Sequence, residues 1–339
     1  MHIKNSVSKW ALVLVVSFLF SCQNPSIGVA PTSTYPPIPT QNGFIQTATL
    51  SVSKTPTMNM ESPVSLNRPD FADLKHGQYL LVQSYQNGIP ILYVYSTDGE
   101  IAKKITFDAN FSVSNNGTQL IMMLPSSRIY YSLNLQTQEM TTFNLDRDCY
   151  DADLSSDKRF FALSCLNDWT GDIYIFEKKS DSMLRITDCL EMVHSCFKPS
   201  WSPDGQWLAY YRNEEKSGIH TLDGIYLLNM ACTEYGCKKQ IGPILSDSNP
   251  IWSQNNELVV SEFGSISFFE VRDNSLIFIR KYESGIENVV SVSLSPDGEH
   301  IAFSPIDNSA IYIYSSASGA AEKLIDLDQE VLLIGWIIK

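Results

Sequence analysis

Short runs of apolar and β-branched residues recur from about residue 66 to residue 339, and stretches rich in Gly, Pro, Asn, Asp and Ser separate them. The runs are four to eight residues long, and none continues into the 3.6-residue periodicity of an amphipathic helix. Runs of this length between turn residues are typical of β-strands. The pattern therefore predicts an all-β body over residues 66–339.

One sequence unit recurs at the turns. Its two clear copies are WSPDGQWLAY at 201–210 and LSPDGEHIAF at 294–303. Weaker copies begin at residues 113, 154 and 252, and a degenerate copy begins at residue 74. The serines of the five better copies lie 41, 47, 51 and 42 residues apart, which is the length of a propeller blade; they are Ser114, Ser155, Ser202, Ser253 and Ser295.

An aromatic-rich run follows each copy and is predicted to form the third strand of a blade. The six runs lie at residues 92–95, 129–132, 173–176, 225–228, 266–269 and 311–314, so we expect six blades. The C-terminal run 331–338 carries Trp336 at the repeat position of Trp201 and Trp252. We therefore expect it to supply the innermost strand of the N-terminal blade and to close the ring. The alternative is a β-sandwich of unrelated hairpins.

The backbone preferences of its residues explain why the repeated Ser-Pro-Asp-Gly segment forms a tight turn. Proline presets φ at one corner of the turn, and glycine accepts a positive φ at the other. Asp204 and Asp297 are expected to accept hydrogen bonds from nearby backbone N–H groups. The tryptophans at one repeat position are expected to be packing residues rather than a stacking platform for sugars or bases.

The unit at 201–210 and its relatives resemble the WD-like repeat of TolB-type β-propellers, over residues 66–339. The resemblance implies a six-bladed propeller. It also implies kinship with periplasmic and surface proteins that bind other proteins, and with propellers appended to peptidases. The peptidase reading is disfavoured because the chain has no Gly-x-Ser-x-Gly nucleophile elbow.

The N-terminus has the features of an export signal over residues 1–21. Lys4 and Lys9 form a basic region, and residues 10–20 form an apolar run too short to span a bilayer. The following residues, Ser21 and Cys22, resemble a bacterial lipobox, which implies that Cys22 is diacylated. An ordinary signal peptide that ends in Ser-Cys is the alternative. Residues 22–65 are rich in Pro, Ser and Thr, and we expect them to form a disordered tether.

Six cysteines remain besides Cys22, an even number that favours disulfides in an exported chain. Cys189 with Cys196 and Cys232 with Cys237 are close in sequence, which leaves Cys149 with Cys165. Six cysteines allow 15 pairings, so this connectivity is a hypothesis. A zinc site is disfavoured because no Cys-x-x-Cys is present.

The charge and the motifs limit the possible functions. The chain has a net charge of −13, and removal of the signal would make the mature body more acidic, which argues against nucleic acid and anionic lipid as partners. No phosphate-binding loop, zinc-protease motif or calcium loop is present. We therefore expect no catalytic residues, no metal and no cofactor.

One set of residues is a candidate binding site. An acid precedes the predicted first strand of each blade, so the six acids would ring one mouth of the channel and attract a cation, an amine or a basic segment. They are Asp108, Asp148, Glu191, Asp247, Glu287 and Asp328. The alternative is that these are ordinary loop acids of an acidic protein.

These observations favour a monomeric lipoprotein, held on the extracytoplasmic face of a cell or outer membrane by its lipid anchor alone. Its propeller would bind or scaffold an envelope or extracellular protein. The alternatives are a small-molecule or carbohydrate sensor, or a propeller enzyme such as a lyase or cyclase, that uses the channel mouth.

Overall fold

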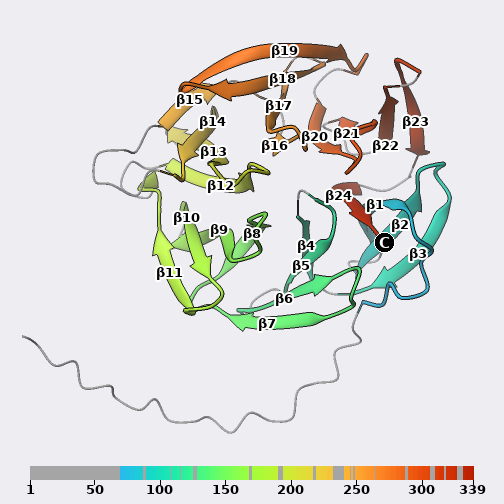
Figure 1. Cartoon of the computed structure of the whole chain (residues 1–339), viewed down its shortest axis with the longest axis horizontal. Coiled ribbons are helices and arrows are strands. Elements are labelled where there is room, and N and C mark those ends of the chain that lie inside the picture. Colours follow the sequence, from blue (N-terminus) through green and yellow to red (C-terminus); the bar gives the residue numbers. More distant parts are fainter. Residues whose placement is uncertain are drawn as a thin grey trace, which may run out of the picture. The chain divides into compact units, whose positions relative to one another are not determined.

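The repeated strands form six four-stranded antiparallel sheets that lie around a common centre as the blades of a propeller (Figure 1). The computed structural model describes residues 69–339 except 87–88, 108, 115, 125–127, 168–169, 190–193, 217–218, 232–239, 245, 247–248, 263, 287–288, 306–309, 317 and 327–330. The described residues all belong to one unit, Pro63–Lys339. The predicted all-β, six-bladed fold is confirmed.

The strands of each blade follow in order from the innermost to the outermost. Blade 1 comprises β24 (Val331–Ile338), β1 (Gln78–Gln86), β2 (Ile89–Ser96) and β3 (Ile101–Thr106). Blade 2 comprises β4 (Asn110–Val113), β5 (Gln119–Met123), β6 (Ile129–Asn134) and β7 (Met140–Asn144). Blade 3 comprises β8 (Cys149–Leu154), β9 (Phe160–Asn167), β10 (Thr170–Glu177) and β11 (Ser182–Arg185). Blade 4 comprises β12 (His194–Trp201), β13 (Trp207–Lys216), β14 (Ile219–Asn229) and β15 (Gln240–Ile244). Blade 5 comprises β16 (Ile251–Trp252), β17 (Glu257–Glu262), β18 (Ser265–Arg272) and β19 (Ser275–Glu283). Blade 6 comprises β20 (Val289–Leu294), β21 (His300–Pro305), β22 (Ala310–Ser315) and β23 (Ala320–Asp326).

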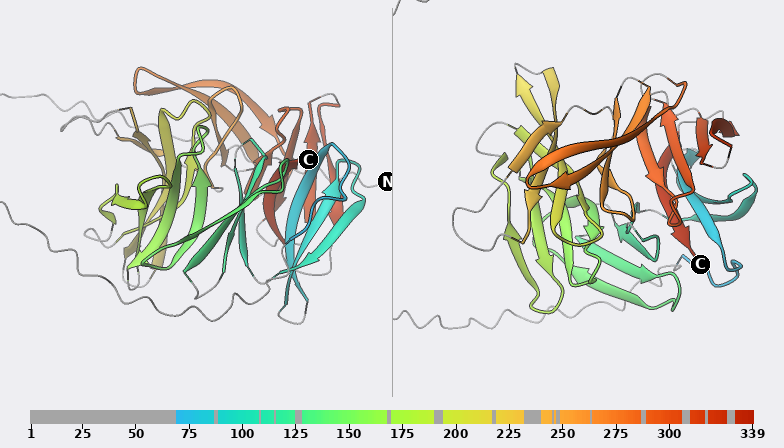
Figure 2. Two further views of the ribbon diagram at one scale, coloured as in Figure 1. Left: turned by 60° about the horizontal axis from the view of Figure 1, so that its bottom comes forward. Right: turned by 45° about the horizontal axis from the view of Figure 1, so that its top comes forward.

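The innermost strands contact one another in the order β24, β4, β8, β12, β16, β20 and back to β24. They lie around the centre of the ring (Figure 1) and, as the equivalent strands of six equivalent sheets, run in the same direction along a central channel. We call the end at which they begin the top face, and the end at which the repeat turns lead into the second strands the bottom face. Figure 2 shows the strands of the blades running between these two faces.

The C-terminal strand closes the ring, as predicted. β24 pairs with β1, and Trp336 lies opposite Leu80. On its other side, the Ile338 N–H donates a 2.8 Å hydrogen bond to the Gly117 carbonyl in the turn of blade 2. Gly117 has a φ of +68°, and a Cβ there would lie 3.1 Å from the Trp336 carbonyl oxygen. The last strand is therefore held by β1 of its own blade and by the turn of blade 2, and glycine is needed where that turn approaches it.

A buried serine organises the repeat turn in blades 2 to 6. In blade 4, the Ser202 Oγ donates to an Oδ1 of Asp204 at 2.6 Å and accepts from the Trp207 N–H at 2.9 Å. The Asp204 carboxylate also accepts from the Gln206 N–H, as the sequence predicts for this residue. The turns that begin at Ser114, Ser155 and Ser295 repeat the serine contacts. The serine links both ends of the turn, which explains why it persists in the eroded copies.

Apolar side chains fill the space between neighbouring blades. Trp201 packs against Ala162 and Ile173 of blade 3, and Trp252 packs against Trp207 of blade 4. Trp336 occupies the same place between blades 1 and 6. All three repeat tryptophans are buried, which confirms that they are packing residues.

The predictions for the N-terminal region lie outside the described residues. These are the signal over 1–21, the lipidated Cys22 and the tether over 22–65. Within residues 69–339, as far as the structure describes them, no helix is long and apolar enough to span a membrane.

Candidate functional site

The predicted acidic ring consists of the six acids that precede the innermost strands in the sequence. Asp148 is described; the other five, Asp108, Glu191, Asp247, Glu287 and Asp328, lie outside the described residues. The Asp148 carboxylate is exposed and pairs with Arg128 at 3.1 Å. Asp148 lines a pocket between blades 2 and 3, and it is not among the residues that line the central cavity. The ring as a whole stays a prediction.

The pocket beside Asp148 has a mixed lining of polar and apolar side chains, with Arg128 and Asp148 as its charged residues. Its volume is about 260 Å³, and Met123, Leu124 and Leu166 contribute apolar side chains. Arg128 forms the rim and is fixed by a second hydrogen bond, from Nη1 to the Asp146 carbonyl at 2.9 Å. A pocket of mixed polar and apolar lining with a fixed guanidinium suits a protruding side chain of a protein partner.

Large apolar side chains are also exposed on the top face. Tyr85 is 51% exposed at the end of β1, and Leu332 is 42% exposed at the start of β24. They lie close together because Leu332 pairs with Gln83 across the two strands. Leu166, at the pocket, is also 42% exposed. A second set of exposed apolar residues lies on outermost strands: Ile101 on β3, Leu184 on β11, and Ile277, Phe278 and Ile279 on β19.

The central channel contains a polar cavity of about 180 Å³, lined by residues from all six blades. Its charged lining residues are Asp151, Asp153 and Lys198, from β8 and β12. Ser291 and Ser293 of β20 add hydroxyl groups. The cavity is smaller than pockets for drug-sized ligands, which measure about 300–1,000 Å³.

Lys198 has an unusual backbone conformation. Its φ is +54°, although it lies inside a strand; the other non-glycine residues with positive φ in the described part of the chain lie in turns or at strand ends. The β12–β13 register shifts between Phe197 and Ser200, so Lys198 occupies a β-bulge at a position where glycine is usual. Such strain costs on the order of 1 kcal/mol. The Lys198 Nζ lies 2.6 Å from Oδ1 of Asp151.

Asp153 joins blades 3 and 4 with its carboxylate. One oxygen accepts from the Trp201 N–H at 2.7 Å, and the other accepts from the Leu154 N–H at 2.8 Å. Burial raises the pKa of Asp153 to about 7, although these two backbone hydrogen bonds act in the opposite direction. The neutral carboxyl group is therefore the form that folding favours.

This raised pKa predicts a pH-dependent stability. Because the folded pKa lies above the unfolded value of about 3.9, the contribution of Asp153 is fully present below about pH 4 and is lost as pH rises through about 7. We expect Asp153→Asn, which stays neutral, to gain stability relative to the native chain between pH 5 and pH 8, by about 1–3 kcal/mol. Urea unfolding of both chains at the two pH values measures this gain. An equal difference at both pH values would contradict it.

Two of the three predicted disulfides are present. Cys149 and Cys165 lie opposite each other on β8 and β9 and are bonded. Cys189 is bonded to Cys196 and staples the segment that leads into β12. Cys232 and Cys237 lie outside the described residues, so their pairing stays a prediction.

A fully buried carboxylate anchors that stapled segment. Asp172 accepts hydrogen bonds from the Thr187 Oγ1 and from the Cys189 N–H, both at 2.8 Å. The Arg185 Nε lies 3.0 Å from its other oxygen as an ion pair and donates a hydrogen bond to the Thr187 carbonyl. Asp172 thus fixes the path of the chain at the top of blades 3 and 4.

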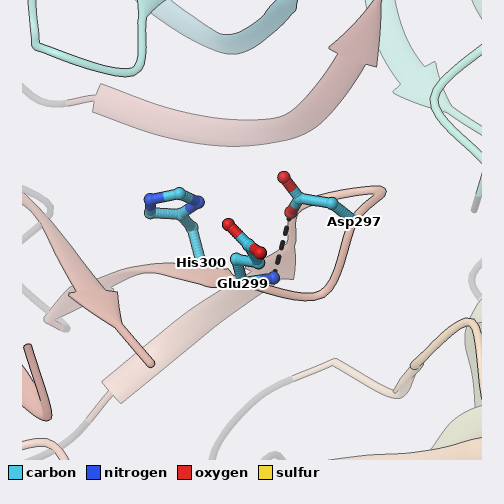
Figure 3. Close-up of side chains that lie close together, drawn as sticks. All are labelled: Asp297, Glu299 and His300. Atoms are coloured by element: carbon cyan, nitrogen blue, oxygen red, sulfur yellow. Dashed lines mark hydrogen bonds between the residues drawn. The ribbon is translucent and has the colours of Figure 1, made fainter. Parts of the chain in front are cut away.

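Asp297, Glu299 and His300 bring metal-binding side chains together in the turn after β20 (Figure 3). The Asp297 carboxylate already accepts hydrogen bonds from Ser295, Gln78 and the Glu299 N–H. These are contacts of the repeat turn, as predicted for Asp297. Since nothing else at this exposed turn points to a metal ion, we assign the group a structural role.

Sequence reasoning did not single out Asp151, Lys198 or Asp172. Asp151 and Lys198 are 47 residues apart and meet only because blades 3 and 4 are adjacent. One local signal was present, since Pro199 follows Lys198 inside a predicted strand, and proline in a strand marks a bulge or an edge.

Comparisons with known proteins agree with the fold. The chain matches no family model, and no curated protein matches it in sequence. Among solved structures, TolB from Acinetobacter baumannii superposes with a TM-score of 0.53 and 16% identity, covering 78% of this chain and 67% of TolB. The propeller domain of Cps50 (Swd1) from Myceliophteria thermophila gives 0.45 and 15%, covering 74% of this chain and 86% of that domain. A functionally unknown protein from Desulfotomaculum acetoxidans gives 0.47 and 11%, covering 76% and 99%. The likeness to TolB shows that the chain shares the β-propeller fold, as the repeat predicts.

Proposed function

We propose that this protein is a membrane-anchored extracytoplasmic lipoprotein whose propeller binds another protein through its top face. The observation that carries the proposal is the combination on that face of exposed Tyr85, Leu332 and Leu166 with the pocket rimmed by Arg128 and Asp148. Apolar anchors beside a fixed charged rim are characteristic of protein interfaces. The β-propeller supports this role because its loops and strand ends present a broad surface on a rigid scaffold.

The cavities favour a macromolecular partner over a drug-sized ligand. The central cavity and the pocket between blades 2 and 3 measure about 180 and 260 Å³, and both are below the usual range for such ligands. β19 is a competing protein-binding surface because three apolar residues are exposed on it. Its bulge beside Phe268 and the charged Lys281 oppose the addition of a further strand, so we favour the top face.

The test is affinity capture by the full chain from detergent-solubilised envelope. We expect one envelope protein to be captured by the native chain and its recovery to fall at least tenfold with the Tyr85→Ser/Leu166→Ser/Leu332→Ser variant. The matched control is Ile101→Ser/Leu184→Ser, which removes apolar side chains that are at least as exposed but lie on the outermost strands β3 and β11. We expect this variant to capture the partner normally. Loss of capture with a β19 variant, Ile277→Ser/Phe278→Ser, but not with the top-face variant would overturn the assignment to the top face.

The anchor is tested in the same cells. The Cys22→Ser chain should incorporate no labelled palmitate and should leave the membrane fraction, because one or two acyl chains supply the membrane affinity. Retention of the Cys22→Ser chain in the membrane fraction would contradict the lipid anchor and would leave the top-face proposal standing.

A further inference from the structure

The walls of the central cavity are chemically unequal. β8 and β12 supply Asp151 and Lys198, and β20 supplies Ser291 and Ser293. In the ring order of the innermost strands, β20 lies across the channel from β8. Asp151 and Lys198 therefore form an ion pair in the cavity lining, and Ser291 and Ser293 lie on the strand opposite β8 in the ring. The places of β8 and β20 in the ring can be followed in Figure 1.

The ion pair retains unused bonding capacity. The Asp151 Oδ1 contacts the Lys198 Nζ, but its Oδ2 is buried and accepts no hydrogen bond from the described residues. The Lys198 ammonium group has three N–H donors, of which this contact uses one. A buried acceptor without a donor is costly, so a ligand that brings a donor to Asp151 would gain from its desolvation.

The backbone of Lys198 is a second, independent observation. The bulge requires a positive φ, which glycine would adopt without strain. A lysine in its place costs stability and sets an ammonium group into the channel wall. Strained backbone that a simpler residue would relieve is concentrated at functional sites.

From these observations we propose that the channel binds a small zwitterion of the α-amino-acid class. The ligand ammonium donates to the Asp151 carboxylate, and the ligand carboxylate accepts from Nζ of Lys198, with the serines of β20 also in the lining. A cavity of about 180 Å³ admits a ligand of only a few heavy atoms. The site lies inside the channel, and of the three apolar side chains proposed to contact the protein partner only Leu332 also lines it.

The experiment is isothermal titration calorimetry of the full chain in detergent with glycine, L-alanine and L-serine. N-acetylglycine and glycinamide serve as probes that each lack one of the two charges. We expect saturable binding of at least one zwitterion, and at least tenfold weaker binding of both single-charge probes. Asp151→Asn and Lys198→Met should each lose the binding. Equal binding of the zwitterion and a single-charge probe, or no binding of any of the three amino acids, would overturn the proposal.

A stability measurement separates a ligand site from a structural ion pair. We expect the double variant Asp151→Asn/Lys198→Gly to melt at the temperature of the native chain or above it, because the strain is relieved, and to bind no zwitterion. A double variant that melts several degrees lower and still binds the amino acid with native affinity would show that the pair is structural and would contradict the assignment.

Discussion

Deletion of residues 331–339 is expected to abolish cooperative unfolding of this protein. β24 is the innermost strand of blade 1 and contributes buried Val331, Leu333, Trp336 and Ile337. Without it, β1 would lose its partner and the ring would open between blades 6 and 2, exposing apolar surface and unpaired strand edges. Circular dichroism melting of the truncated chain measures the effect.

Two control variants test whether the loss of cooperative unfolding comes from opening the ring. Trp336→Ala should retain a cooperative but destabilised transition, lower by about 3–5 kcal/mol, because it removes one large buried side chain and keeps the strand. Deletion of residues 1–62, which lie outside the unit that contains the blades, should leave the melting temperature unchanged. A truncated chain without 331–339 that melts like the native protein would contradict closure by β24.

Asp172→Ala is expected to destabilise the fold by about 2–4 kcal/mol. The change leaves the Thr187 hydroxyl and the Cys189 N–H without their acceptor and removes the carboxylate that faces Arg185. Each buried polar group left unpaired costs about 1–3 kcal/mol. Urea unfolding at pH 7 measures the loss.

An exposed carboxylate provides the matched control for Asp172. Asp73 pairs with Lys103, but its side chain is largely exposed, so Asp73→Ala should cost much less stability than Asp172→Ala. Asp172→Asn keeps the one oxygen that accepts from both Thr187 and Cys189 and loses the charge that faces Arg185, so its loss should lie between those of the two alanine variants. Equal losses for Asp172→Ala and Asp73→Ala would contradict the anchoring role of Asp172.

The fold could be predicted because its determinants are local. In blades 2 to 6, the serine that links both ends of the turn and the glycine, Lys158 or Asn256 that adopts a positive φ there lie within a few residues of one another. Ring closure was also predictable, since Trp336 marks the C-terminal run as a first strand. A repeat therefore encodes both its own strands and the way in which they pack.

The candidate sites depend on contacts between blades, and a repeat does not encode these. Asp151 of blade 3 contacts Lys198 of blade 4. Arg128, between β5 and β6, pairs with Asp148, between β7 and β8. The raised pKa of Asp153 follows from burial by neighbouring blades, which its sequence context does not reveal. Residues that depart from the repeat, such as Lys198 in a bulge, are not needed to form a blade and are therefore the best candidates for a binding role.

Site-specific photocrosslinking in intact cells tests the top-face interface most directly. A photoreactive amino acid is placed at Leu166 on the top face or at Leu184 on the outermost strand β11. Leu184 is 66% exposed and is therefore at least as accessible as Leu166. We expect the Leu166 position to give a discrete crosslinked adduct with one envelope protein and the Leu184 position to give none. An adduct from Leu184 alone, or no adduct from Leu166 in cells that capture the partner, would contradict binding through the top face.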